Sequence, residues 1–486
     1  MVPKVTAKTT LLLLACLFLF ELALILMVMA IYMKAERSFP TFLASKPGIV
    51  FLLAIGLLLL AGAIITYQYL ATPQLHMRHL RSIVIINLVT TALLLLTVEI
   101  TLRAKSVSSQ EGEVLFGTVL RPLNWPKVAL HYRGLIDHQS GQLSYLVHDD
   151  TLGWTVGPDK KKVDGLYSTD SNGIRISHSE MGFTKLGRKT PIALMGDSHT
   201  FGQEVAYEDT WGYMLEKSLG AEFQVLNFGV PGYGMDQAFL RFERNVRSWK
   251  PRILVYALNS GAINRALIVY PFFSRPDWNL PFSKPRLILQ DGEVKTINIP
   301  ALSGETIFIQ PSVLDLPFLK YDIGYKQSDW QHKPYHFSYL ARLFVSRFPR
   351  WSLVSPAVSD EALLSLNISI LRAFVRSAEQ SGVIPIVVHL PQPPEVERPA
   401  LTRIGKQVLE KAHIEYVDLM PCLLKLNPAD RLVPSGDHYS PQANAAIANC
   451  LRNAVNESIA IQKPGRSFGA QDSYGAQDLE SGSYDG

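Results

Sequence analysis

The chain has few cysteines and a small net charge, and both features narrow the classes of protein to which it can belong. Only three cysteines occur in 486 residues, and Cys16 lies inside an apolar run. Cys422 and Cys450 remain for the rest of the chain, where they form either one disulfide in an oxidising compartment or two free thiols. The net charge of +5 is small and dispersed, which argues against a nucleic acid as partner.

Metal-ligand patterns are missing as well. No group of Cys, His and Asp residues has the spacing of a metal site, and we expect neither a metal nor another cofactor. The last stretch, 463–486, contains a tandem GAQD and almost no aliphatic residues. Such a segment cannot bury enough apolar surface to fold, so we expect a disordered tail.

Long apolar runs, in contrast, are abundant near the N-terminus. The hydrophobic fraction of 48% is concentrated in residues 11–33, 49–70 and 83–102. Each run is long enough to cross a bilayer, which takes about 20 helical residues, and a cleaved signal peptide would have a shorter apolar region. We therefore expect a membrane module over 1–105 with three transmembrane helices, in contact with the lipid bilayer. Glu21 interrupts the first run, and we expect it to face another helix or a polar cavity. The charges of the flanking loops do not decide the orientation.

The pattern changes after the membrane module. Residues 106–189 form a polar lead-in with many turn signals, and 190–462 alternate short apolar strands with amphipathic helices. This alternation predicts an α/β domain with a parallel sheet covered on both faces. The expected strands are 192–195, 223–227, 253–257, 384–389 and 414–419, and the expected helices are 208–219, 235–248, 361–381, 400–412 and 441–455.

One segment interrupts the alternation. Residues 266–360 are rich in proline and aromatic residues, with a hairpin predicted around Asp291-Gly292. An insertion of this size after a sheet strand builds either a lid or substrate wall or a structural hairpin packed elsewhere.

Candidate catalytic groups follow the strands. The stretch GDSH begins at Gly196, a glycine-rich turn NFGVPGYG covers 227–234, side-chain amides occur at Asn259 and Asn264, and DHYSP begins at Asp437. Carboxyl ends of parallel strands meet at one edge of the sheet. Together these groups supply acyl transfer by a hydroxyl nucleophile.

Each of these residues then takes a role. Ser198 is the expected nucleophile, His438 the base, and Asp437 the acid that orients the imidazole. The backbone N–H groups of Ser198 and Gly232, with the Asn259 amide, would stabilise the oxyanion.

At these motifs the chain resembles the SGNH (GDSL-like) hydrolases. GDSHT is similar to that family's first block, NFGVPGYG to its second and DHYSPQAN to its last, and HDDTLGW…YSTDSNGIR resembles the lead-in of membrane-anchored bacterial members. The resemblance implies a flavodoxin-like, SGNH-type parallel-sheet sandwich over 190–462, with 266–360 as an inserted hairpin or lid region. It places Ser198 on the nucleophile, Gly232 on the oxyanion glycine and His438 on the base.

Two blocks depart from the family. The third usually reads Gly-x-Asn-Asp, but here it begins at Asn259, so that Asn259 or Asn264 substitutes for the oxyanion amide or that donor is missing. The last usually places the acid three residues before the histidine, where this chain has Ser435. Asp418 is a fallback acid, and a Ser-His dyad is also open.

Other polar residues near the motifs have plainer interpretations. We expect His199 to be a wall residue, because it adjoins Ser198 in sequence, and His389 to line the cleft or make a buried hydrogen bond. Gly153, Trp154 and Arg175 are expected to be structural.

These features predict a membrane-anchored serine esterase or acyltransferase that acts on O-acyl groups of envelope glycans or lipids. The alternative is an inactive SGNH-fold module that binds a glycan or a partner protein. Similarity to SGNH hydrolases favours an envelope substrate, and so a multi-pass protein of the cell membrane with its catalytic domain outside the cytoplasm. Partner membrane proteins stay unidentified.

Overall fold

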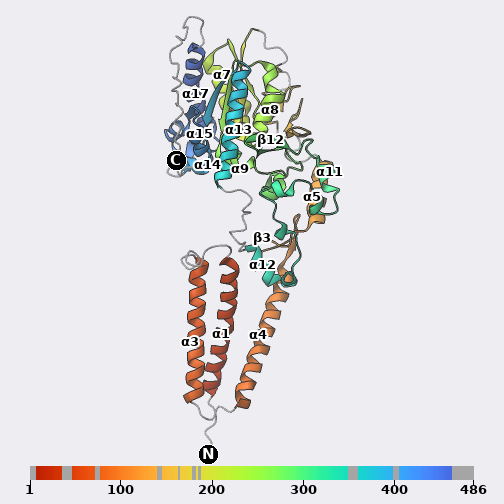
Figure 1. The fold of residues 1–486 in the computed structure, drawn as a ribbon, viewed down its shortest axis with the longest axis vertical. Helices are drawn as coiled ribbons and strands as arrows, with labels where there is room; N and C mark the ends of the chain where they lie inside the picture. The colour runs from red at the N-terminus through yellow and green to blue at the C-terminus, as the bar shows by residue number, and fades with distance from the viewer. Residues whose placement is uncertain are drawn as a thin grey trace, which may run out of the picture.

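The computed structural model describes residues 7–34, 46–71, 77–138, 145–162, 165–177, 182–183, 188–347, 360–397 and 404–461. The predicted tail, 463–486, lies outside the described residues. In Figure 1 long N-terminal helices stand at one end of an elongated molecule, and the α/β domain lies at the other.

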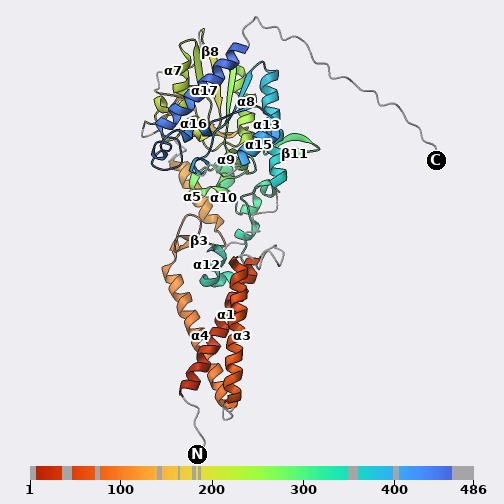
Figure 2. The same cartoon turned by 90° about the vertical axis from the view of Figure 1, so that its left-hand side faces the viewer.

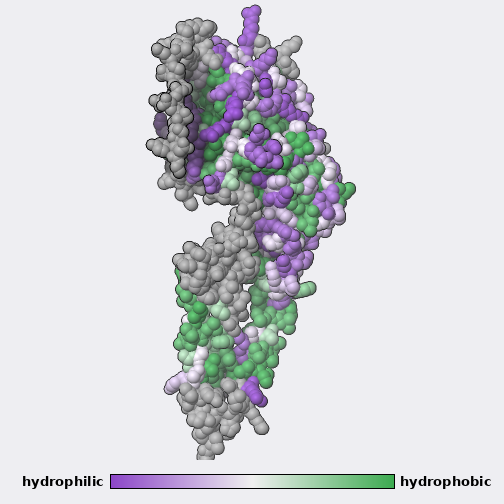
Figure 3. All heavy atoms as spheres, in the orientation of Figure 1, coloured by the Kyte–Doolittle hydropathy of each residue, from purple (hydrophilic) through white to green (hydrophobic). Residues whose placement is uncertain are grey.

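The N-terminal helices are α1 (Ala7–Lys34), α3 (Lys46–Ala71) and α4 (Met77–Lys105). Within the described residues, one helix is long and apolar enough to cross a membrane, Arg81–Lys105 of α4. The apolar parts described in α1 and α3 are shorter, Thr10–Ala23 and Leu52–Tyr67. The prediction of three spans is therefore reduced to three helices with one candidate span. Figure 3 shows hydrophobic residues over this end of the molecule and mostly polar ones over the other.

The acid inside the first apolar run has polar partners on another helix. Asn87 Nδ2 and Thr91 Oγ1 of α4 donate to the two carboxylate oxygens of Glu21 at 2.8 and 2.6 Å. This confirms that Glu21 faces a neighbouring helix. Such hydrogen bonds lower the cost of an acid among apolar residues, so α1 and α4 are joined by a polar contact.

A parallel five-stranded sheet forms the centre of the α/β domain. Its order is β14-β13-β10-β8-β9, and every pairing within it is parallel. The strands are β8 (Thr190–Met195), β9 (Phe223–Asn227), β10 (Ile253–Leu258), β13 (Ile384–His389) and β14 (Tyr416–Asp418). All five predicted strands are present, and the last is shorter than predicted.

Helices cover both faces of this sheet (Figures 1 and 2). Along β8, Ala193 and Met195 belong to one buried cluster, whereas Ile192 and Leu194 belong to the other, because successive side chains of a strand point to opposite faces. The first cluster includes residues of α8 (Met235–Arg244), α13 (Asp360–Gln380) and α15 (Ile404–Ala412). The second includes residues of α7 (Trp211–Leu219), α16 (Met420–Leu424) and α17 (Pro441–Ile461). The doubly covered α/β sheet is thus confirmed.

The lead-in and the insertion share a core of their own. Aromatic residues of α5 (Trp125–His138), α10 (Pro271–Ser274) and α11 (Gly304–Phe308) pack together, and the Tyr132 and Phe308 rings stack with centroids 4.6 Å apart. The predicted hairpin is β11 (Arg286–Gln290) and β12 (Glu293–Ile297). Its turn residues Asp291 and Gly292 both have positive φ, as a tight hairpin turn requires.

Shorter elements complete the chain. They are β1 (Val107–Ser108), β2 (Glu113–Leu115), β3 (Thr118–Leu120), β4 (Leu146–Asp149), β5 (Gly153–Val156), β6 (Ser168–Thr169), β7 (Arg175–Ile176), α6 (Ser198–Phe201), α9 (Ser260–Arg265), α12 (Tyr339–Arg347) and α14 (Pro393–Glu397), with several 3-10 turns between them.

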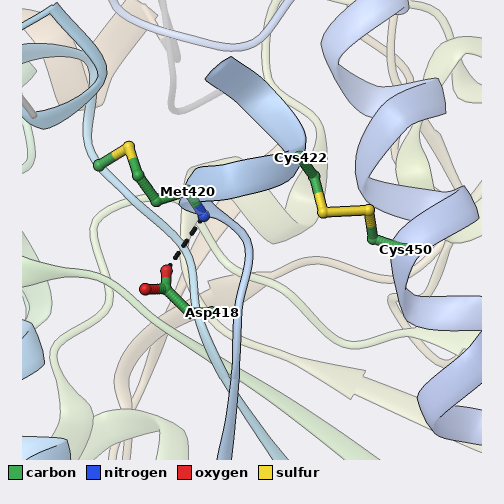
Figure 4. The surroundings of a disulfide bond; sticks show 4 residues. All are labelled: Asp418, Met420, Cys422 and Cys450. Atoms are coloured by element: carbon green, nitrogen blue, oxygen red, sulfur yellow. Dashed lines mark hydrogen bonds between the residues drawn. A yellow bond between two sulfur atoms is a disulfide. The ribbon is translucent and has the colours of Figure 1, made fainter. Parts of the chain in front are cut away.

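A disulfide joins Cys422 of α16 to Cys450 of α17 (Figure 4). The sequence had left a bridge and two thiols open, and the structure has the bridge. It encloses the loop that carries His438, and both cysteines pack against the buried cluster under α17.

Candidate active site

The turn after β8 explains the stretch GDSH. Gly196 is packed so closely that an added Cβ would lie 2.2 Å from Thr200 Oγ1 and 2.9 Å from the Ala257 carbonyl oxygen. Asp197 caps α6 by accepting from the His199 backbone N–H at 3.1 Å. Glycine and aspartate therefore build the turn, and Ser198 is placed at the first position of α6, at the carboxyl end of the strand.

Ser198, His438 and a carboxylate form a hydrogen-bonded row. His438 Nε2 lies 3.0 Å from Ser198 Oγ, and His438 Nδ1 lies 2.5 Å from Glu204 Oε2. A proton on Nδ1 is donated to the carboxylate, which leaves Nε2 free to accept the serine proton. The structure thus brings Ser198 and His438 together as predicted, and it supplies an acid that the sequence had not indicated.

The Glu204 carboxylate is held by its surroundings. Its backbone has φ of 68°, a conformation that is costly for a residue with a Cβ. The Glu204 N–H donates to the Tyr167 hydroxyl at 2.7 Å, and Ser435 Oγ donates to Glu204 Oε2 at 3.0 Å. Ser435 occupies the position where the family pattern has its acid, so here that position supports the carboxylate.

The buried side chain of Arg175 holds the loop that carries Glu204. Its guanidinium donates to the backbone carbonyls of Phe201, Gly202 and Val205. These carbonyls surround Glu204 in sequence, so Arg175 holds the turn that presents the carboxylate. The structural interpretation of Arg175 is confirmed.

The structure does not place the predicted acids at the imidazole. Asp437 is exposed and lines the cavity, and its backbone N–H donates to Ser435 Oγ at 3.2 Å. Residues 434–438 form turns and bends, and the carboxylate at His438 Nδ1 is that of Glu204, which takes the place predicted for Asp437. The fallback Asp418 accepts from His389 Nδ1 at 3.0 Å and pairs with Lys406. His389 therefore makes a buried hydrogen bond, one of the two interpretations offered for it.

Two backbone N–H groups are available for an oxyanion. Among the described residues, neither the Ser198 nor the Gly232 N–H has an acceptor in the protein, and both residues line the cavity. Gly232 has φ of 82°, and a Cβ there would lie 3.2 Å from the Trp278 ring and 3.3 Å from the Trp154 ring. Trp154 Nε1 also donates to the Pro231 carbonyl at 2.9 Å, which confirms its structural interpretation.

Asn259 does not join this pair. Its Nδ2 donates to Asp197 Oδ2 at 2.6 Å, and its Oδ1 caps α9 by accepting from the Ala262 N–H. The side chain is buried and does not line the cavity. The predicted oxyanion role of Asn259 is therefore replaced by a structural one, because the buried Asp197 carboxylate needs donors.

Asp197 is a buried anion beneath the row. Burial alone raises the pKa of its carboxyl, but the nearby Arg265 guanidinium and the other donors hold that pKa below its ordinary value. Arg265 Nε also donates to the Tyr233 carbonyl at 2.8 Å. Since Arg265 lines the cavity as well, it links the turn of Ser198 to the glycine turn around Gly232.

His199 forms part of the wall. Burial lowers the pKa of its imidazole to about 4, so the ring is neutral near pH 7. The ring lies 5.0 Å from that of His438, centroid to centroid. The imidazole hydrogen-bonded to Ser198 Oγ is that of His438, whereas His199 lines the cavity as a wall residue, as predicted.

The cavity above the row has a volume of about 530 Å3. The insertion supplies one side of it, through Arg275, Asp277, Trp278 and Leu280. Arg275 pairs with Asp277 at 3.0 Å, and its guanidinium lies 4.8 Å from the Trp278 ring centroid. This part of the insertion therefore forms a wall of the cavity, which is one of the two interpretations offered for the insertion.

Sequence reasoning missed Glu204 and Trp278. The only signal for Glu204 was indirect: the acid position of the last block is occupied by Ser435, which leaves the imidazole in need of another carboxylate. Trp278 had no signal, because its contact with Gly232 depends on how the insertion folds. Among the described residues, no group of three His, Cys, Asp or Glu side chains is arranged to hold a metal ion.

Comparisons with known proteins add likenesses of structure. No family model matches the chain, and neither does any curated protein. Solved structures that resemble it include a lipase/acylhydrolase from Enterococcus faecalis, with 12% identity over 57% of this chain and 100% of the other, at a TM-score of 0.30. The psychrotrophic esterase EstA from Pseudoalteromonas sp. has 10% identity over 56% and 100%, also at 0.30.

A third likeness is to a protein from Desulfitobacterium hafniense DCB-2, described as lipolytic and of the G-D-S-L family. It has 14% identity over 55% of this chain and 99% of the other, at a TM-score of 0.28. Similarity at these TM-scores carries no functional argument.

Proposed function

We propose that the chain is a membrane-anchored serine esterase or acyltransferase of the SGNH (GDSL-like) type. The observation that carries this proposal is the row of Ser198 Oγ, His438 Nε2 and Nδ1, and Glu204 Oε2, at 3.0 and 2.5 Å, beside two backbone N–H groups without acceptors. A buried turn or a binding surface needs no such row, whereas acyl transfer needs each part of it.

The chemistry follows from these positions. Ser198 Oγ attacks the ester carbonyl carbon while its proton passes to His438 Nε2, and Glu204 stabilises the imidazolium. The N–H groups of Ser198 and Gly232 donate to the oxyanion. When the intermediate collapses, the alkoxide leaves with the proton from His438 and the acyl group stays on Ser198. Water then gives hydrolysis, and a sugar hydroxyl gives transfer.

The lining of the cavity favours an O-acylated glycan over a long-chain lipid. Charged and polar side chains dominate it, including Arg265, Arg275, Asp277 and Glu397. An acyl chain gains about 0.8 kcal/mol for each buried CH₂, and this lining offers it little apolar surface. A short acyl group on a sugar suits the site better, with Trp278 as a flat apolar face for the ring.

The disulfide and α4 support the proposed location. A persistent disulfide is typical of an oxidising compartment, and Arg81–Lys105 is a candidate span. An odd number of spans, whether one or the three proposed from the sequence, places the N-terminus and the α/β domain on opposite sides of the membrane. We therefore propose a cell-membrane protein with a cytoplasmic N-terminus and its site outside the cytoplasm.

One observation favours the alternative, an inactive module that binds a glycan or a partner protein. Within the described residues the third oxyanion donor of the family pattern is absent, since Asn259 is bound to Asp197 and Asn264 is exposed and does not line the cavity. Loss of one such donor costs about 10² to 10³ in rate. That loss slows an ester hydrolase but does not abolish its chemistry, so the esterase proposal is preferred.

The experiment is a substitution of the nucleophile. The purified full chain is assayed in detergent with p-nitrophenyl acetate and with an acetylated polysaccharide, as wild type, as Ser198→Ala and as the matched control Ser458→Ala, on α17 away from the cavity. We expect Ser198→Ala to lose about 10⁴-fold or more in kcat and the control to keep wild-type turnover. Turnover by Ser198→Ala within about tenfold of wild type would refute the proposal. A wild type that binds the polysaccharide but turns over neither ester would favour the binding module.

A further inference from the structure

Exposed apolar side chains gather where α4 ends. Phe337 is 83% exposed, Phe116 73% and Val107 66%. Tyr335 and Leu340 are also exposed. We call these five residues the juxtamembrane patch. Single exposed apolar residues are ordinary, but a group of exposed apolar residues beside a candidate span is typical of a site that contacts protein or membrane.

The patch is fixed to α4 by a small core. Leu102 of α4, Leu115 and Leu120 of the β2–β3 hairpin are buried together, with Tyr339 and Leu343 of α12 packed against them. Val107 begins β1, two residues after the end of α4, and Phe116 lies in the turn between β2 and β3. The patch therefore belongs to one packed unit with the end of the helix.

Hydrogen bonds from α4 set the depth of α12. The Glu99 carboxylate accepts from the Tyr339 N–H at 2.8 Å, the Ser338 hydroxyl at 3.0 Å and the Leu340 N–H at 3.2 Å. Arg103 donates to the Phe337 carbonyl. The first turn of α12 is thus level with residues 99–103.

For a bilayer that α4 spans, that level is near the bilayer surface. A helix of 25 residues is about 38 Å long, against a hydrocarbon core of about 30 Å, so each end reaches a few Å into the headgroup region. Glu99 lies about 9 Å before Lys105 along the axis. Residues beside 99–103 are therefore near the boundary between headgroups and acyl chains, where aromatic side chains are enriched.

Charge around the patch suits the same surroundings. Lys105, Lys333 and Arg347 are exposed on the segments that carry or adjoin it. Three acids of these segments are paired with arginines: Glu99 with Arg103, Glu113 with Arg342 and Asp329 with Arg121. Basic residues around apolar ones are typical of segments that lie in an anionic membrane surface.

We propose that the juxtamembrane patch is inserted into the headgroup region of the bilayer that α4 crosses, on the side of the α/β domain. This proposal rests on the membrane anchoring proposed above and goes beyond it. The consequence is that the insertion has two roles: one part lines the catalytic cavity, and another holds that cavity at a fixed height above the lipid.

The test reads the surroundings of single residues in the full chain. In a Cys16→Ser background with the native disulfide intact, Phe337→Cys and Leu340→Cys are labelled with an environment-sensitive fluorophore. Each protein is reconstituted into vesicles of phosphatidylcholine with a minority of phosphatidylglycerol. Quenching is measured with a doxyl lipid labelled near the headgroup and with aqueous iodide. Leu94→Cys on α4, read with a second lipid that carries its doxyl group deep in the acyl chain, reports anchoring. The control is Leu130→Cys, exposed to 64% on α5, which lies farther from the N-terminal helices (Figures 1 and 2).

The expected result is quenching of Phe337→Cys and Leu340→Cys by the lipid and loss of quenching by iodide, with the reverse at Leu130→Cys. Iodide quenching at both patch positions as strong as at Leu130→Cys would overturn the proposal. Protection from both quenchers would also overturn it, because the patch would then be covered by protein. If the Leu94 label is not quenched by the lipid with the deep doxyl group, the anchoring itself fails.

Discussion

Replacing Glu204 by glutamine tests whether the carboxylate at His438 is the orienting acid. The substitution keeps the size of the side chain and removes its charge. Loss of a buried orienting carboxylate costs about 10⁴-fold in kcat in other serine enzymes. The Glu204 side chain is 35% exposed, so water replaces part of what it does, and we expect a loss of about 10² to 10³-fold, equivalent to about 3–4 kcal/mol of barrier.

Asp437→Asn is the matched control. Asp437 adjoins His438 in sequence and lines the cavity but makes no hydrogen bond to the ring, so kcat should stay within about threefold of wild type. The assay is p-nitrophenyl acetate turnover by the full chain, with melting temperatures recorded to show that each variant is folded. A mild Glu204→Gln, or an Asp437→Asn with the larger loss, would refute the assignment.

Three further outcomes follow from buried contacts. Arg175→Leu leaves three carbonyls without their donor and should lower stability by about 3 kcal/mol or more, seen in chemical unfolding of the detergent-solubilised chain; an unchanged midpoint would contradict this. Replacing Cys422 and Cys450 by serine removes a bridge with a separation of 28 residues and should cost about 3–4 kcal/mol in the chain-entropy model, whereas an equal melting temperature would show that the bridge adds nothing. His199 has a folded pKa of about 4, below its unfolded value of about 6.5. The stability that depends on a neutral His199 is therefore present above pH 6.5 and is lost as the pH falls towards 4, by up to about 3 kcal/mol. A His199→Gln variant whose melting temperature has the same pH dependence as wild type would refute this.

The sheet was predictable because its signal is local. Each strand is a short apolar run that ends at a turn. Because the sheet is buried on both faces, its strands are continuous apolar runs and do not alternate apolar with polar residues. The turn chemistry was equally local: Gly196, Asp197 and Ser198 belong to one strand end. His438 could be placed because its loop precedes a helix that begins with Ser440 and Pro441, an ordinary helix start.

The acid could not be predicted by proximity in sequence. Asp437 is adjacent to His438 in sequence, yet the carboxylate hydrogen-bonded to the ring is that of Glu204. Glu204 is far from His438 in sequence and meets it through a turn held by Arg175 and Tyr167. Those clamps come from the lead-in, whose packing on the domain has no periodic signature. The predicted oxyanion role of Asn259 was wrong for a related reason. Its amide donates to the buried Asp197 carboxylate, and the burial of Asp197 is not visible in the sequence.

The prediction of three membrane spans shows a different limit. Hydropathy reads composition and length, and it predicted helices at the right places. Whether each helix crosses a bilayer also depends on continuous apolar length, which the described residues supply in α4. The disulfide was left open because its formation depends on how α17 packs beside α16.

Covalent labelling of Ser198 tests the central claim most directly. A fluorophosphonate reacts with a serine hydroxyl only where a neighbouring base activates it. The full chain is treated with the probe and digested, and the modified peptide is identified by mass spectrometry for wild type, Ser198→Ala and His438→Ala. The account predicts one modified residue, Ser198, and loss of the label in both variants. A folded wild type that stays unlabelled, or that carries its label on another residue, would contradict it.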